Sequence, residues 1–239
     1  MPELFVLVNI QNHIAWITLK KPEIDREIAQ ALKEIAADLN GNNDVYAVVI
    51  TGYGDVFCRG GEKDAEGAAA ALASIEKPVI AAINGEAFGA GLELALAADI
   101  RIASENALFK LPQIIEGRLP SDGGTQRLPR IVGRGKALEL LMTAETLTAA
   151  QALDIGLVSR VVPAVELKNE TAKLAEIVAA KGPVALRYLK EAVIKGMDMT
   201  LEQGLRLEAD LYFLLHTTSE RTEGIKSYLE KRKPNYEGK

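Results

Sequence analysis

Glu93 stands in the segment of this sequence best suited to acid–base chemistry. A buried strand is predicted to end at Asn84-Gly85, and small residues after it lead into an apolar helix over 92–98 that carries Glu93 in its first turn. A helix N-terminus offers free N–H donors and a partial positive charge, which suit a developing oxyanion. Its neighbours Leu92 and Leu94 would exclude water and raise the pKa of the Glu93 carboxyl toward values useful in proton transfer. The alternative is a glutamate that only complements its helix dipole.

Two further segments could contribute to a site. Residues 57–62 read Phe-Cys-Arg-Gly-Gly-Glu, in which Gly60 and Gly61 permit unusual backbone angles and close approach of a ligand to backbone N–H groups. The alternative there is a plain tight turn. Residues 111–129 form a long segment rich in Gly and Pro between elements, and loops of this kind commonly carry sites.

Several classes of function are disfavoured by composition and spacing. The net charge of −5 argues against nucleic-acid binding, and the basic cluster at 231–233 is by itself typical of a solvated helix end. The two histidines, His13 and His216, lie far apart, which argues against a zinc site. The segment Gly89-Ala90-Gly91 lacks the third glycine of a dinucleotide fingerprint.

The cysteine count and the N-terminal residues indicate a compartment. One cysteine, Cys58, excludes an internal disulfide, and neither a signal peptide nor an apolar run of about 18–20 residues is visible. We therefore expect a cytoplasmic protein that does not associate with membranes.

The elements that must position these residues follow from periodicity. Residues 4–10 and 13–19 predict a β-hairpin with its turn at Gln11 and Asn12, and apolar spacing over 24–39 predicts a helix. Strands are predicted at 46–52, 78–85 and 100–103, the first being of the kind buried on both faces. Because helical stretches separate them, the fold class is α/β. After about residue 164 only helices are predicted, at 167–180, 184–196, 201–216 and 219–232.

Taken together, the chain resembles the enoyl-CoA hydratase/isomerase (crotonase) superfamily. The resemblance rests on segments spread along nearly the whole chain: 78–85, 89–95, 99–103, 123–130, 149–152, 156–158 and 230–232. It implies a crotonase-like spiral of ββα units followed by a C-terminal helical trimerisation region. We accordingly expect a spiral core with the acyl-CoA site in residues 1–180 and a helical oligomerisation region in residues 181–239.

The resemblance also implies a ligand and a set of site residues. The substrate would be an acyl-CoA thioester whose oxygen is held by the backbone N–H groups of Gly61 and Ala90, the latter standing where the family usually has Gly. Five residues are expected to contact the substrate: Arg59, Gly60, Asp122, Tyr228 and Lys231. Of these, Tyr228 and Lys231 would lie near the CoA phosphates, often across a subunit boundary. The chain would assemble as a trimer or hexamer. No metal or redox cofactor is implied, because coenzyme A belongs to the substrate.

The sequence departs from the family at the second acid. Typical hydratases use two glutamates, and Glu93 matches the first, whereas Gln113 occupies the second position. An amide cannot transfer a proton at neutral pH, although it can orient water. Glu116 or Asp122 could substitute; alternatively Glu116 faces solvent and Asp122 caps the helix that follows. The segment 62–77 is also shorter than the corresponding segment usually is in the family, where it helps to wall the acyl pocket, so we expect a pocket that is either more open or differently shaped.

These observations lead to an expected activity and its rivals. We expect hydration or dehydration of an enoyl- or dienoyl-CoA, with Glu93 as the principal acid and base and Gln113 positioning substrate or water. Double-bond isomerisation is the alternative within the enzyme class. A non-catalytic acyl-CoA binding protein is the alternative outside it.

Overall fold

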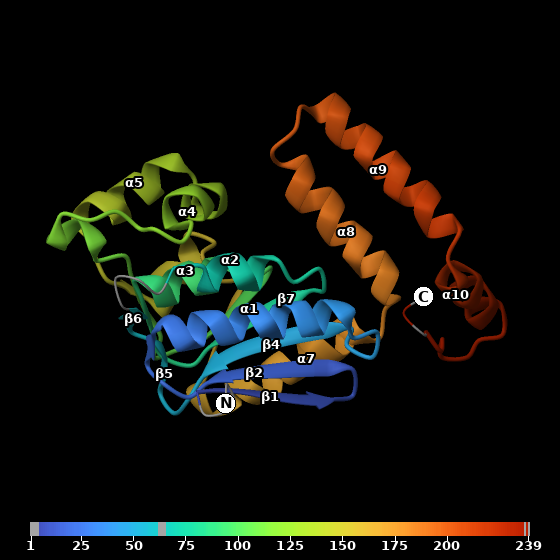
Figure 1. Ribbon diagram of the computed structural model, residues 1–239, viewed down its shortest axis with the longest axis horizontal. Helices are drawn as coiled ribbons and strands as arrows, with labels where there is room; N and C mark the ends of the chain where they lie inside the picture. Colours follow the sequence, from blue (N-terminus) through green and yellow to red (C-terminus); the bar gives the residue numbers. More distant parts are fainter. Residues whose placement is uncertain (1–4, 62–65, 237, 239) are drawn as a thin grey trace.

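The computed structural model describes residues 5–61, 66–236 and 238, and its main body is built on a six-stranded sheet (Figure 1). The strands are ordered β1 (Val6–Gln11), β2 (Ile14–Leu19), β4 (Ala47–Gly52), β7 (Val79–Ile83), β9 (Ile100–Ser104) and β12 (Arg160–Val162). Within this six-stranded sheet, as far as the structure describes it, the β1–β2 pair is antiparallel and the other pairs are parallel. The predicted hairpin is confirmed, but its turn is one residue later, at Asn12 and His13, whose φ angles are 51° and 63°.

Both faces of this sheet are covered, as the apolar strand pattern predicted. Val48 and Ile50 of β4 belong to the main core, whereas Val49 packs with Leu167 and Ala175 of helix α7 (Leu167–Ala179) on the other face. This division follows from the alternation of side chains along a strand. The main core also takes in the apolar sides of α1 (Arg26–Gly41), α2 (Ala68–Ala73) and α3 (Ala90–Ala97).

A second, smaller set of strands was not predicted. Four short strands are ordered β11 (Leu147–Thr148), β10 (Leu108–Lys110), β8 (Glu86–Phe88) and β5 (Val56–Cys58), and β3 (Glu23–Ile24) pairs with β6 (Gly60–Gly61). Strands of two or three residues are too short to show periodicity. Each of β5, β8 and β10 comes directly after a long strand, and helices α2, α3 and α4 (Gly124–Val132) follow, so the expected ββα repeat is present.

The rest of the chain is mostly helical. A 3-10 turn, η2 (Gln113–Glu116), precedes α4, and α5 (Arg134–Thr143), α6 (Ala149–Asp154) and the turn η3 (Ala164–Glu166) complete the body. Helices α8 (Pro183–Gly196), α9 (Leu201–His216) and α10 (Ser219–Leu229) extend to one side of it (Figure 1). The four predicted C-terminal helices are therefore confirmed, although the last ends at Leu229. Among the residues described, none of the helices combines the length and apolar character needed to cross a membrane.

Candidate active site

Three parallel strands bring the candidate residues to one edge of the small sheet. Strands β5, β8 and β10 lie side by side and run in the same direction. Gly60 and Gly61 follow β5, Ala90 follows β8, and Gln113 follows β10. Because the carboxyl ends of parallel strands meet at one edge, segments that are distant in sequence converge there, and ligands of α/β sheets commonly bind at such an edge.

The backbones of Gly61 and Ala90 approach each other closely. An ideal Cβ built on Gly61 would lie 3.1 Å from the Cβ of Ala90 and 2.9 Å from the carbonyl oxygen of Ile24. Gly89, with φ +52° and ψ −120°, precedes α3 and makes Ala90 its first residue. The N–H groups of a first helical turn have no acceptor within the helix. The two N–H groups predicted for an oxyanion hole therefore belong to neighbouring stretches of backbone.

Glu93 is a buried carboxylate held by hydrogen bonds from a distant segment. Glu93 is only 2% exposed. Its Oε1 accepts hydrogen bonds from the backbone N–H groups of Asp122 at 2.8 Å and Gly124 at 2.9 Å. Burial raises the pKa of Glu93, the two N–H groups oppose that effect, and the negative charge of Asp122 raises the pKa further. The carboxylate thus meets the start of α4, rather than only complementing its own helix.

Gln113 completes the immediate surroundings of Glu93. Gln113 is 9% exposed, and its Nε2 donates a hydrogen bond to Oε2 of Glu93 at 3.2 Å. Its Oε1 is buried and accepts no hydrogen bond from the part of the chain that the structure describes. A buried acceptor without a partner costs free energy, so this oxygen suits a donor brought by a ligand or water.

The two acids considered as substitutes for a second glutamate have other partners. Asp122 accepts hydrogen bonds from the backbone N–H groups of Gly67, Ala69 and Ala70, so it caps the N-terminus of α2 rather than the helix that follows it. Glu116 is exposed and pairs with Arg118. Asp122 reaches Glu93 through its backbone N–H rather than through its carboxylate.

The remaining predicted substrate contacts are divided between two places. Gly60 lies beside Gly89, since an ideal Cβ on Gly89 would be 3.7 Å from the Gly60 Cα, and Arg59 pairs with Glu86 at 2.5 Å. Tyr228, 83% exposed, is in the last turn of α10, and Lys231 follows the end of that helix. In Figure 1, α10 lies far from α3 and β6. One chain alone does not bring them to Glu93. Glu62 and the first part of the shortened segment, residues 62–65, lie outside the described residues.

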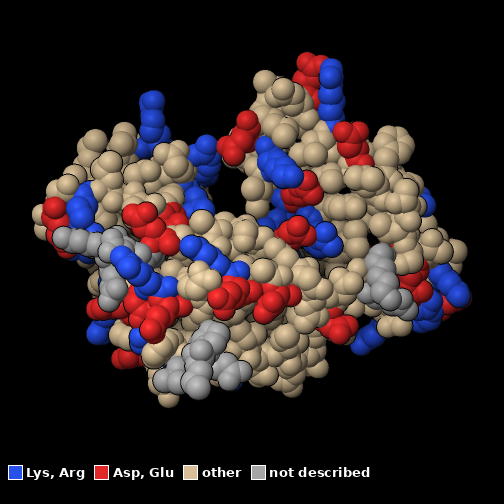
Figure 2. Space-filling model, viewed as in Figure 1, with Lys and Arg blue, Asp and Glu red and all other residues tan. Residues whose placement is uncertain are grey.

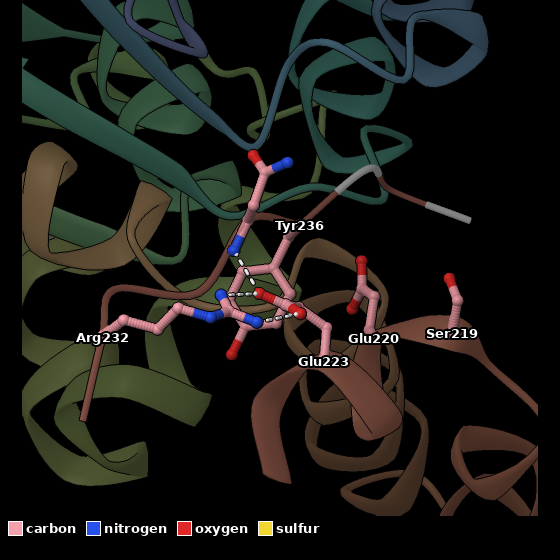
Figure 3. A pocket seen from close by; sticks show the side chains of 6 residues that line it. Ser219, Glu220, Glu223, Arg232 and Tyr236 are labelled. Carbon is pink, nitrogen blue, oxygen red and sulfur yellow. Dashed lines mark hydrogen bonds and ion pairs between the residues drawn. The ribbon is translucent and has the colours of Figure 1, made fainter. Parts of the chain in front are cut away.

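A separate pocket of about 420 Å³ lies where α10 meets the C-terminal segment (Figure 3). Its charged groups have partners within the protein: Arg232 pairs with Glu223 at 2.5 Å and with Glu230 at 2.6 Å, and Glu220 accepts hydrogen bonds from the backbone N–H of Val184. None of the predicted site residues lines it. In the described parts of the chain, no group of three or more His, Cys, Asp or Glu side chains could hold a metal ion.

Sequence reasoning missed the backbone of Asp122 and Gly124 as the partner of Glu93. The available signal was the glycine pair Gly123-Gly124 at the start of a predicted helix, because a helix start presents N–H donors to an anion. What that signal could not supply was the identity of the anion, which lies about thirty residues earlier in the chain.

Comparisons with known proteins identify the family and the fold of this chain. The profile of the family described as enoyl-CoA hydratase/isomerase matches residues 9–239. The (E)-benzylidenesuccinyl-CoA hydratase of Thauera aromatica is 37% identical over 98% of this chain and 99% of its own, and the crotonyl-CoA hydratase of Syntrophomonas wolfei is 36% identical over 97% of each. A crystal structure of an enoyl-CoA hydratase from Bacillus anthracis superimposes with a TM-score of 0.91 at 34% identity, covering 98% of this chain and 99% of that one. The chain belongs to the enoyl-CoA hydratase/isomerase (crotonase) superfamily, and its fold is the mixed α/β crotonase fold with C-terminal helices.

Proposed function

We propose that this protein adds water to, or removes it from, the double bond of an enoyl- or dienoyl-CoA thioester. The observation that carries the proposal is the buried Glu93 carboxylate, whose Oε2 contacts Gln113 Nε2. That Nε2 lies 3.8 Å from an ideal Cβ built on Gly89, the residue before Ala90. The hydratase names of the relatives support the same reaction class.

In this proposal the N–H groups of Gly61 and Ala90 bind the thioester oxygen. Attack of water at C3 of the enoyl group moves negative charge onto that oxygen and forms an enolate. Two fixed donors stabilise this charge more than they stabilise the neutral substrate, and removing one such donor typically lowers the rate by about 10²–10³.

Glu93 would serve as both base and acid. It accepts a proton from the attacking water through Oε2 while the hydroxyl oxygen bonds to C3, and it then returns that proton to C2 as the enolate collapses. Atoms balance, since one water is added and the enzyme is unchanged. The raised pKa of Glu93 suits the proton-accepting step, because a carboxylate with a higher proton affinity is a stronger base toward the attacking water.

Gln113 would orient the water. Its Nε2 is fixed by Glu93, so its unpartnered Oε1 can accept one hydrogen of a water whose other hydrogen points to Glu93. This division of roles replaces the second carboxylate by a group that positions without exchanging protons.

Self-association as a trimer or hexamer forms part of the proposal. Large apolar side chains are exposed on α8 and α9, among them Leu189, Val193, Leu205 and Phe213. A cleft of about 510 Å³ with a largely apolar lining separates α8 from α3 and α4, and Figure 2 shows this hollow. Tyr228 and Lys231 would then contact the CoA of a neighbouring subunit. Sedimentation should give a mass three or six times that of one chain.

The first experiment is incubation with linear, branched and cyclic enoyl- and dienoyl-CoAs in normal and deuterated water, with products read by mass. Addition of one water supports the proposal and identifies the acyl class. Deuterium exchange without added water would show an isomerase instead, and tight binding without turnover would show an acyl-CoA binding protein. The variant Glu93→Gln should bind acyl-CoA and lose turnover, whereas retained turnover would contradict the role of Glu93.

A further inference from the structure

Cys58 is a buried thiol that the proposed reaction does not use. It is fully buried at the end of β5, two residues before Gly60, and its thiol donates a hydrogen bond to the Gly60 carbonyl at 3.1 Å. Burial raises the pKa of Cys58 to about 11, so the sulfur keeps its proton at neutral pH and remains a donor.

That hydrogen bond acts on the peptide group that carries a proposed oxyanion donor. The Gly60 carbonyl and the Gly61 N–H belong to one planar peptide unit, so fixing the direction of the carbonyl fixes the direction of the N–H. The peptide joins two glycines, and Gly60 has φ +141°, so the local backbone has little conformational restriction of its own. Its pairing with β3 covers only two residues, Glu23 and Ile24.

Cys58 also contacts the segment that carries the second donor. An ideal Cβ on Gly91 would lie 2.2 Å from the Cys58 carbonyl oxygen and 2.7 Å from the Cys58 Cβ. The first turn of α3 therefore packs directly on Cys58, one residue after Ala90. A single residue thus touches the supports of both N–H groups.

We infer that Cys58 is a positioning residue of the oxyanion hole: its thiol holds the Gly60–Gly61 peptide so that the Gly61 N–H meets the thioester oxygen. This inference rests on the proposed function. It assigns the thiol no bond to substrate and no redox role.

The test compares Cys58→Ala, which removes the donor, with Cys58→Ser, which keeps one. The alanine variant should lower kcat about tenfold, less than the loss of a whole donor, with little change in KM. The serine variant should restore most of that kcat. Val56→Ala, a buried truncation in the same strand, is the matched control and should lower the melting temperature without lowering kcat.

A second readout does not need turnover. A cinnamoyl-CoA with an electron-donating amino group at the para position absorbs at longer wavelength when its thioester oxygen accepts hydrogen bonds. The wild type and Cys58→Ser should shift its absorption to longer wavelength, and Cys58→Ala should shift it less at saturation.

Equal shifts and equal kcat in wild type and Cys58→Ala would overturn the inference while leaving the proposed function intact. A serine variant as impaired as the alanine variant, or a Val56→Ala variant with the same loss of kcat, would also overturn it. A wild type that neither shifts the probe nor converts any acyl-CoA would refute the proposed function, and this inference with it.

Discussion

Replacing Gln113 by glutamate would place two carboxylates in contact at the centre of the site. Gln113 Nε2 and Glu93 Oε2 are 3.2 Å apart, and both residues are buried. Two negative charges at that distance repel by about 5 kcal/mol at an effective dielectric constant of about 20. Because about 1.4 kcal/mol corresponds to a factor of ten, this repulsion raises the proton affinity of the pair by a factor of several thousand. The pair would share a proton at neutral pH.

Sharing a proton changes how stability depends on pH. The folded Gln113→Glu variant would hold a proton that the unfolded chain releases above the ordinary glutamate pKa of about 4.3. Since the folded state then binds more protons, its free energy of unfolding should fall as the pH rises from that value to the raised pKa of the pair. Below that range both states are protonated, and the repulsion is absent.

Chemical unfolding between pH 4 and pH 9 measures this effect. The variant should lose stability relative to the wild type across that range, by up to several kcal/mol. Gln126→Glu is the matched control, because Gln126 is exposed near the start of α4, and it should follow the wild-type curve. If Gln113→Glu follows that curve as well, the contact between Gln113 and Glu93 does not exist as described.

Three further predictions concern the same site. Burial raises the pKa of Glu93, so the wild type loses stability as the pH rises and Glu93→Gln does not. The free energy of unfolding of Glu93→Gln minus that of the wild type should therefore be larger at pH 8 than at pH 5, as measured by unfolding at both values. Asp122→Ala removes the cap of α2 and should cost about 0.5–2 kcal/mol in a denaturant titration. Gly89→Ala and Gly156→Ala both force alanine into positive φ, and each should lower the free energy of unfolding by about 1–3 kcal/mol. Only Gly89→Ala should lower kcat in the enoyl-CoA assay. Equal loss of kcat in the two glycine variants would show that Gly89 does not position α3.

The long elements could be predicted from local pattern alone. The apolar run of β4 and the helical spacing in α9 are periodic over enough residues to show their type, and the structure has both. The strands β5, β8 and β10 were not predicted, because three residues are too few to show a period, although these strands bring the candidate residues together. The prediction placed the hairpin turn one residue too early, because neither a glycine nor a proline marks the boundary between strand and turn there.

For the candidate site, the sequence together with its family resemblance indicated the chemical groups: a carboxylate at Glu93, an amide at Gln113, and backbone N–H groups at Gly61 and Ala90. Tertiary structure decided their environment. The N–H groups that bind Glu93 come from Asp122, before α4, and Gly124, its first residue, about thirty residues later in the chain. A carboxyl pKa depends on every group packed around it in space, and that packing is set by the folded chain rather than by neighbours in sequence.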